Sequence, residues 1–155
     1  MNLKKVKLTE MHAKEISNWK YDEEYSIYNL PTWDKMLQEK YSLCDDAKRE
    51  RYIGFVNENK ELVGFVNLQD QGDSVFFGIG VNPRVCGIGL GKRITEIALI
   101  ESQNRFPNVP VVLEVRTWNK RAVCCYKSQN FKVIATKEQE TKLGFAKFYV
   151  MECKS

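Results

Sequence analysis

The stretch that decides the fold is Val81-Asn82-Pro83-Arg84-Val85-Cys86-Gly87-Ile88-Gly89-Leu90-Gly91-Lys92. An apolar run over residues 75–81 leads into it, and a helical pattern over residues 90–104 follows it. Its three alternate glycines let the backbone turn tightly and approach a ligand, because no Cβ stands in the way. A helix start offers unpaired N–H donors and a partial positive charge. The stretch therefore predicts a strand, a loop and a helix that together bind a phosphate-like anion.

Two common phosphate-binding loops fit this stretch poorly. A Walker loop ends in Gly-Lys-Ser/Thr, whereas Lys92 is followed by Arg93. A dinucleotide fingerprint has the spacing G-x-G-x-x-G and an acidic residue about 20 positions later at a strand end. The chain has G-x-G-x-G instead and lacks that acid. A nucleotide-binding protein is therefore the least favoured interpretation.

A second informative stretch lies later in the chain, from Leu113-Glu114-Val115-Arg116 through Asn119 and Tyr126 to Asn130-Phe131. Together with Arg84-x-x-Gly87-x-Gly89, it resembles the motifs of the GNAT acetyltransferase superfamily, in the version seen in ribosomal-protein alanine N-acetyltransferases. The resemblance covers about the second half of the chain. It implies an α+β fold, with a mixed, mostly antiparallel central sheet of about six to seven strands flanked by about four helices.

Hydrophobic patterning predicts the same order of elements along the chain. Thr9 is the expected N-cap of the first helix. The expected strands span residues 3–8, 52–56, 62–68, 74–81, 111–116, 131–135 and 145–151. The expected helices span residues 11–19, 32–41, 90–104 and 119–128.

Length and composition narrow the class of protein. The 155 residues suit a single domain, residues 1–155. No apolar run of about 18 residues and no signal-peptide pattern is found, so we expect a cytoplasmic protein that does not enter a membrane. Five cysteines without C-x-x-C spacing and one histidine argue against disulfides and against a metal site. The net charge is +4, and the basic residues are scattered among acidic ones, which disfavours nucleic acid as a partner.

The resemblance implies that acetyl-CoA is the acetyl donor. The loop and the helix start would bind its phosphates, and the last strand residues before the loop would pair with its pantetheine arm. The Val81 N–H would then polarise the acetyl carbonyl. Lys92 and Arg93 either reach the phosphates or are solvated helix residues, and Gly78 and Gly80 either admit the coenzyme or form a bulge. The expected coenzyme-binding residues are Ile79, Val81, Arg84, Cys86, Gly87, Ile88, Gly89, Leu90, Gly91, Lys92 and Asn119.

Two residues of the second stretch are the candidate catalytic groups. By resemblance, the Tyr126 hydroxyl is the general acid that protonates the leaving sulfur, and seven-residue spacing would place Asn119 on the same helix face. Glu114 is the candidate general base, because its apolar neighbours predict burial, which makes a carboxylate more basic. The alternatives are a surface ion pair between Glu114 and Arg116, or a base formed by water.

The acceptor is expected to be a small-molecule amine or a peptide N-terminus. Acceptor choice in this family depends on the first helices and the last hairpin. Here residues 19–31 interleave aromatic side chains with Asp22, Glu23 and Glu24, which favours a cationic amine or, alternatively, an acidic surface loop. The sequence therefore predicts an acetyl-CoA-dependent N-acetyltransferase, monomeric or homodimeric. The alternative is a non-catalytic acyl-CoA-binding domain.

Overall fold

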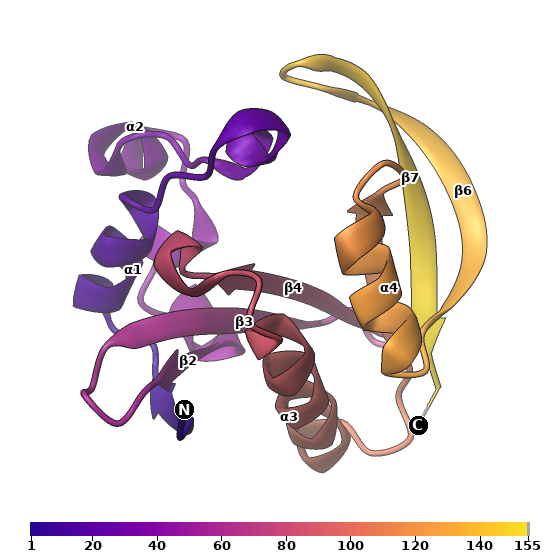
Figure 1. Cartoon of the computed structure of the whole chain (residues 1–155), viewed down its shortest axis with the longest axis horizontal. Coiled ribbons are helices and arrows are strands. Elements are labelled where there is room, and N and C mark those ends of the chain that lie inside the picture. The colour runs from indigo at the N-terminus through magenta and orange to yellow at the C-terminus, as the bar shows by residue number, and fades with distance from the viewer. Residues whose placement is uncertain (155) are drawn as a thin grey trace. The chain divides into compact units, whose positions relative to one another are not determined.

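The computed structural model describes residues 1–154 and contains the predicted alternation of strands and helices (Figure 1). The α-helices are Glu10–Ser17 (α1), Trp33–Gln38 (α2), Leu90–Arg105 (α3) and Lys120–Ser128 (α4). The strands are Lys4–Lys7 (β1), Tyr52–Val56 (β2), Leu62–Asp70 (β3), Val75–Val81 (β4), Val111–Arg116 (β5), Lys132–Thr141 (β6) and Gly144–Cys153 (β7). Short 3-10 helices cover Glu23–Tyr28, Ser42–Cys44, Lys48–Arg51 and Pro83–Val85.

Within the described residues the strands form a seven-stranded sheet in the order β1-β2-β3-β4-β5-β7-β6. The pairs β1–β2, β2–β3, β5–β7 and β6–β7 are antiparallel, whereas β4 and β5 are parallel. The parallel pair requires the long crossover through α3, because a short turn can join only antiparallel neighbours. The mostly antiparallel α+β fold expected from the sequence is confirmed.

The chain divides into two compact units. The first comprises residues 1–67 and 79–90, and the second comprises residues 68–78 and the chain from Gly91 onward. The organisation of the whole chain as a single domain stays a prediction.

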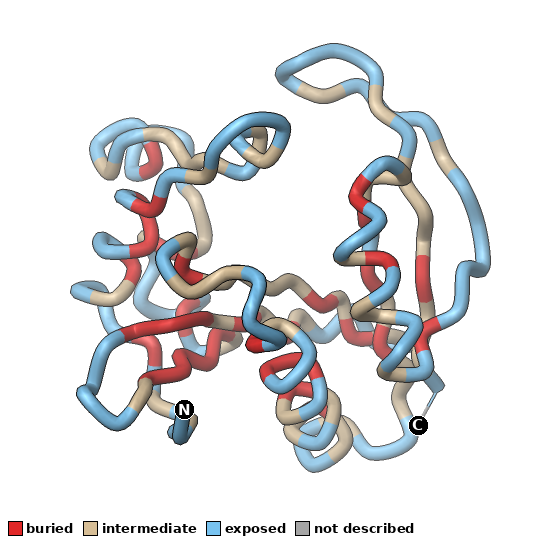
Figure 2. Tube along the Cα trace, viewed as in Figure 1, coloured by how far each residue is buried: buried red, intermediate tan, exposed pale blue. Residues whose placement is uncertain are grey.

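The first unit has a core built from α1, α2 and the strands β2 and β3. Figure 2 shows β2 buried along its length, and all five of its residues are buried. The apolar side chains come from elements far apart in the sequence, which is what a long-range core requires. The core residues are Leu8, Ala13, Ile16, Trp19, Met36, Leu43, Tyr52, Val56 and Leu62.

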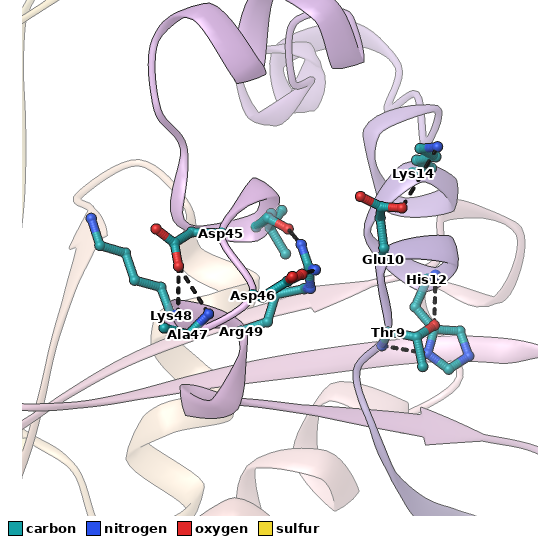
Figure 3. A network of polar contacts seen from close by, with 10 residues as sticks. Thr9, Glu10, His12, Lys14, Asp45, Asp46, Ala47, Lys48 and Arg49 are labelled. Carbon is teal, nitrogen blue, oxygen red and sulfur yellow. Dashed lines mark hydrogen bonds and ion pairs between the residues drawn. The ribbon is translucent and has the colours of Figure 1, made fainter.

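Polar contacts fix the ends of the helices in this unit (Figure 3). The Thr9 hydroxyl accepts the His12 N–H at 3.2 Å, and the His12 ring nitrogen Nδ1 accepts the Thr9 N–H at 3.2 Å. This capping box confirms the predicted cap and gives His12 a structural role. The buried Arg49 guanidinium donates to the Leu43 carbonyl at 2.7 Å and pairs with Asp46. The guanidinium thereby gives the Leu43 carbonyl a hydrogen-bond donor, which a buried backbone carbonyl needs.

The second unit packs α3 and α4 with β5 and β7. Ile94 and Ala98 of α3 have no exposed surface, as the predicted apolar face requires. The Thr95 hydroxyl, also inaccessible, donates to the Gly91 carbonyl at 2.7 Å and thereby satisfies a buried polar group. Asn130, two residues after the end of α4, has φ +70°. Among residues other than glycine, asparagine adopts this left-handed conformation most readily.

The predicted bounds of three elements were wrong. The helix expected over residues 32–41 is shorter, because Lys40 adopts φ +59° and cannot continue a right-handed helix. The last two strands are longer than expected, since β6 and β7 pair from Lys132↔Glu152 to Thr141↔Gly144. Residues 136–141 of β6 are polar, so a search for apolar runs does not identify them as part of a strand.

Candidate functional site

The strand end that precedes the glycine-rich loop is held by hydrogen bonds within the first unit. Asn82 donates its backbone N–H to the Val63 carbonyl at 2.9 Å and its side-chain Nδ2 to the Leu62 carbonyl at 3.1 Å. Its Oδ1 accepts the Arg84 N–H at 3.0 Å and caps the short 3-10 helix Pro83–Val85. Asn82 is buried, so these bonds fix the direction in which the chain leaves β4.

The loop itself presents bare backbone to solvent. Gly87 and Gly89 have φ +84° and +79°, a region that residues with a Cβ rarely adopt. Both are exposed, and no atom lies within 4 Å of where a Cβ would be. Leu90 then begins the 16-residue helix α3, whose first N–H groups have no partner inside the helix. Exposed glycine backbone followed in the chain by the start of a long helix is the sequence of elements that binds phosphates in many proteins.

The side chains predicted to contact the coenzyme lie in different surroundings. Arg84 is paired with Glu61 at 2.6 Å, with 71% of its side chain exposed. The Cys86 thiol donates toward the Asn82 carbonyl at 3.5 Å and the Val81 carbonyl at 3.7 Å, so it is directed at the strand end. Ile88 is exposed, whereas Leu90 is buried.

Gly91 and Lys92 lie in the second unit at the start of α3, with Lys92 exposed. Burial raises the pKa of the Cys125 thiol, and its hydrogen bond with Thr95 and the positive charge of Lys92 oppose this rise.

Tyr21 is a residue that sequence reasoning missed. Its hydroxyl donates to the Val81 carbonyl at 2.6 Å, within the first unit. Burial, and secondarily the nearby Cys86, raise the pKa of Tyr21 well above its usual value, so the hydroxyl stays a donor. Since Asn82 donates its N–H to β3, the peptide between Val81 and Asn82 is held at both ends. No local pattern predicts this contact between residues sixty positions apart.

Gly80 has a packing role that differs from both interpretations made from the sequence. A Cβ at Gly80 would lie 2.2 Å from Cε1 of the Phe65 ring. Phe65 also stacks against Trp19 and Tyr52, each with ring centroids 6.0 Å away. The absence of a side chain at Gly80 is therefore what lets the Phe65 ring lie against β4. Ile79 and Val81, on either side, are partly exposed.

Tyr126 lies on α4 in the second unit and is half-buried. Its ring makes edge-to-face contacts with Phe131 at 5.8 Å and with Phe77 at 6.4 Å between centroids. The Phe131 N–H donates to the Tyr126 carbonyl at 3.1 Å, which ties the next strand to the same turn. Two aromatic neighbours thus fix the plane of the ring independently of its hydroxyl.

Asn119 is the N-cap of α4, directly before the first residue of the helix, and its placement on the same face as Tyr126 stays a prediction. Its side-chain Oδ1 accepts the Ala122 N–H at 3.2 Å, and the residue is 7% exposed. An Asn at this position satisfies one of the unpaired donors of the first turn. This geometry gives Asn119 a structural role, and its contact with the coenzyme stays a prediction.

Glu114 differs from its expected environment. It is exposed, with 29% of its side chain accessible, so the predicted burial was wrong. Its carboxylate accepts a charge-assisted hydrogen bond from the Lys137 ammonium at 2.7 Å. Arg116, the alternative partner, lies over the Phe148 ring at 4.9 Å instead. The exposure of Glu114 follows the alternation of buried and exposed residues along β5, but its partner Lys137 lies on another strand, so the β5 sequence alone does not predict the pair.

The two candidate catalytic residues lie on opposite faces of the sheet. Val75 of β4 pairs in parallel with Val111 of β5, so Phe77 shares a face with the buried odd-numbered residues of β5. Tyr126 packs on Phe77 and therefore on that face. Glu114 alternates to the other face, together with its partner Lys137.

The acidic segment of the first unit is exposed. Asp22, Glu23 and Glu24 all reach solvent, and Glu23 has φ +54° at the start of the 3-10 helix. The segment is closed by Asn29, whose Oδ1 accepts the Tyr21 N–H at 2.7 Å. The acidic segment therefore lies at the surface and is anchored through Tyr21 to the end of β4.

A comparison with family models decides the affiliation. The model of the acetyltransferase (GNAT) family matches residues 13–131. The chain belongs to the GNAT acetyltransferase family. The family expected from the two sequence stretches is therefore confirmed, and with it an acyltransferase.

Solved structures show the same fold over nearly the whole chain. A chimera of the spermidine N-acetyltransferase SpeG from Vibrio cholerae and hSSAT has a TM-score of 0.80 at 23% identity, covering 98% of this chain and 95% of that one. A ribosomal-protein alanine N-acetyltransferase from Escherichia coli has 0.71 at 20%, covering 99% and 94%. A GNAT acetyltransferase from Bacillus anthracis has 0.81 at 10%, covering 99% and 95%. No curated protein matched the sequence.

Two further features of the described residues concern other classes of protein. No helix within residues 1–154 is both long and apolar enough to cross a membrane. The same residues contain no cluster of three or more His, Cys, Asp or Glu side chains arranged to hold a metal ion.

Proposed function

We propose that this GNAT-family chain is an N-acetyltransferase that takes acetyl-CoA as donor and transfers the acetyl group directly to a primary amine. The observation that carries the proposal is the exposed backbone of Gly87–Gly89 ahead of α3. Its positive φ angles and open surroundings leave room for a pyrophosphate. A side chain at either glycine would be strained and would occupy the space that a phosphate needs.

The chemistry requires an anchored thioester, a polarised carbonyl, a neutral amine and a protonated leaving sulfur. When bound, acetyl-CoA supplies an activated acetyl group. The backbone donors from Gly87 to Gly91 and the charge of Lys92 would hold its phosphates. The Val81 N–H would donate to the acetyl oxygen, and Tyr21 would keep that part of the strand fixed through the Val81 carbonyl.

Tyr126 would donate its hydroxyl proton to the departing sulfur, because a phenol is protonated at neutral pH. Glu114 would accept a proton from the acceptor ammonium. Its carboxylate is held in place by the Lys137 ammonium at 2.7 Å. The reaction then balances: its products are the acetylated amine, the free thiol of the coenzyme and one released proton.

Two observations support the acceptor class: the names of similar solved structures, and an acidic segment in the first unit. One similar structure is named for spermidine and another for a ribosomal-protein alanine, and both names describe primary amines. Asp22, Glu23 and Glu24 form an exposed acidic segment next to Tyr21 in the chain. A small-molecule amine or a peptide N-terminus, each cationic at neutral pH, is the proposed acceptor.

Calorimetric titration with acetyl-CoA tests the proposal, with NAD and ATP as controls. Selective binding of acetyl-CoA, followed by thiol release with members of a panel of amines, is the expected result. Binding without turnover on small amines and peptides would favour the acyl-CoA-binding domain instead. Absence of binding would overturn both functions.

A matched pair of variants locates the binding. Gly89→Trp should abolish binding of acetyl-CoA, because the indole would fill the open space beside the loop. Gly72→Trp is the control, since Gly72 also has a positive φ and no neighbour within 4 Å but lies in the turn before β4. Normal binding by Gly89→Trp, or equal losses in both variants, would contradict the predicted role of the loop.

A further inference from the structure

Lys137 of β6 is the residue that holds the carboxylate of Glu114, the candidate base. Its ammonium donates to Oε2 of Glu114 at 2.7 Å, and the two side chains are partly exposed, at 37% and 29%. The other carboxylate oxygen, Oε1, has no hydrogen-bond partner among residues 1–154. One oxygen is therefore fixed, whereas the other can still accept a proton.

The register of three strands explains why these two residues meet. β7 lies between β5 and β6, and its Phe148 pairs with Arg116 on one side and with Lys137 on the other. Residues that pair directly point to the same face of a sheet, and Glu114 lies on that face too, two residues before Arg116. Glu114 and Lys137 therefore extend toward each other over β7, across two strand spacings of about 4.8 Å each.

Two cations flank Glu114 on this face, but only Lys137 pairs with it. The guanidinium of Arg116 lies over the Phe148 ring at 4.9 Å and makes no ion pair with Glu114. Val150, the residue opposite Glu114 on β7, has no side-chain donor. Among the side chains of residues 1–154, Lys137 alone thus fixes the orientation of the carboxylate.

We propose that Lys137 is a positioning residue for acetyl transfer, which holds the Glu114 carboxylate so that Oε1 accepts the proton of the acceptor ammonium. The proposal rests on the proposed function, in which Glu114 is the base. A base acts only within hydrogen-bond reach of the proton that it removes, so a carboxylate free to rotate spends less time in the productive orientation. Lys137 itself neither gains nor loses a proton in this step.

The turnover of Lys137→Met tests the proposal, because methionine is also a long, unbranched side chain but cannot donate a hydrogen bond. The probes are diaminobutane, a small primary amine, and trialanine, a peptide with a free N-terminus. With saturating substrates, kcat should fall about tenfold. Calorimetry should show unchanged affinity for acetyl-CoA, because no residue proposed to bind it lies on β6. Lys137→Arg should keep most of the wild-type kcat, since a guanidinium also donates to a carboxylate.

Arg105→Met is the matched control. Arg105 pairs with Glu101 at 3.1 Å on α3, and these side chains are 34% and 20% exposed, similar to the pair of Lys137. Loss of either partly exposed pair should change unfolding in urea to a similar, small extent. Only Lys137→Met should lower kcat. Equal kcat in Lys137→Met and Arg105→Met, or equal losses in Lys137→Met and Lys137→Arg, would overturn the proposal.

A double-mutant cycle shows whether Lys137 acts through Glu114. Glu114→Gln alone should lower kcat about a hundredfold. Adding Lys137→Met should lower it no further, because the group that Lys137 holds is already gone. A further tenfold loss, about the same as in the single variant, would place the action of Lys137 elsewhere and refute the proposal.

The same measurements separate this proposal from the function on which it rests. A loss of kcat in Glu114→Gln without one in Lys137→Met would refute only the role of Lys137. Wild-type kcat in Glu114→Gln would refute the base assignment and the role of Lys137 together. Absence of thiol release from the wild type with both probes would contradict the proposed function itself, and with it this proposal.

Discussion

Two tyrosines of the first unit make equally short hydrogen bonds but differ in what they hold. The Tyr21 hydroxyl donates to the Val81 carbonyl at 2.6 Å, and the Tyr52 hydroxyl is 2.6 Å from the Ser42 hydroxyl. Burial raises the pKa of both phenols, so both stay protonated at neutral pH. Only Tyr21 holds a residue with a proposed role in catalysis.

Tyr21→Phe is therefore expected to lower turnover at saturating acetyl-CoA by about three- to tenfold, because the Val81 peptide loses one of its two anchors. Tyr52→Phe should leave turnover unchanged. Each variant should lose about 1 kcal/mol of unfolding free energy in urea, the usual net value of one hydrogen bond. Equal turnover in the two variants would reduce Tyr21 to a structural residue.

Tyr126 allows a cleaner separation of chemistry from packing. Tyr126→Phe keeps the ring that contacts Phe77 and Phe131, so its melting temperature should stay close to that of the wild type. If the hydroxyl is the general acid, turnover should fall well over tenfold, since general acid catalysis contributes about a hundredfold or more. Calorimetry should show nearly unchanged affinity for acetyl-CoA. Wild-type turnover would contradict the assignment.

At the scale of elements, the end of β4 depends on Gly80. Gly80→Ala places a methyl group where the Phe65 ring lies, at 2.2 Å from its nearest carbon, so the ring must move. Such overpacking costs about 1–3 kcal/mol. We expect this loss in urea unfolding, accompanied by weaker acetyl-CoA binding, because β4 leads directly into the loop.

A double-mutant cycle with Phe65→Leu checks the cause. The smaller side chain should relieve part of the clash, so the double variant should be more stable than the sum of the two single changes predicts. Simple additivity would show that Gly80 acts through the backbone and not through Phe65.

The same elements show what local sequence can reveal. The bounds of β4, α3 and β5 were predicted well, because an apolar run, a glycine loop and a helical repeat are each visible within a few residues. The left-handed Asn130 also follows from a short-range rule. The environment of Glu114 does not, since Lys137 reaches it from a strand 23 residues away. The Tyr21 bond to Val81 was missed for the same reason.

At the scale of the whole molecule, the ionisable groups with raised pKa values determine the response to alkaline pH. Burial is the largest cause of the rise in each of them: Tyr21, Tyr52, Cys44, Cys125 and Cys153. The first three belong to the first unit and the last two to the second. Both units are therefore affected in the same direction.

The free energy of unfolding should consequently fall as pH rises above about 8.5. In that range the unfolded chain loses thiol and phenol protons that the folded chain keeps, so the unfolded state binds fewer protons and the slope is negative. Urea titrations at a series of pH values up to about 11 measure it. If the two units unfold in separate steps, each step should have a negative slope. Replacing Tyr21 and Tyr52 together by Phe should flatten the slope above about pH 10, where phenols ionise. A free energy that stays level through this range would show that these groups titrate alike in the folded and unfolded chain, and one that rises would show that their pKa values are lowered by folding.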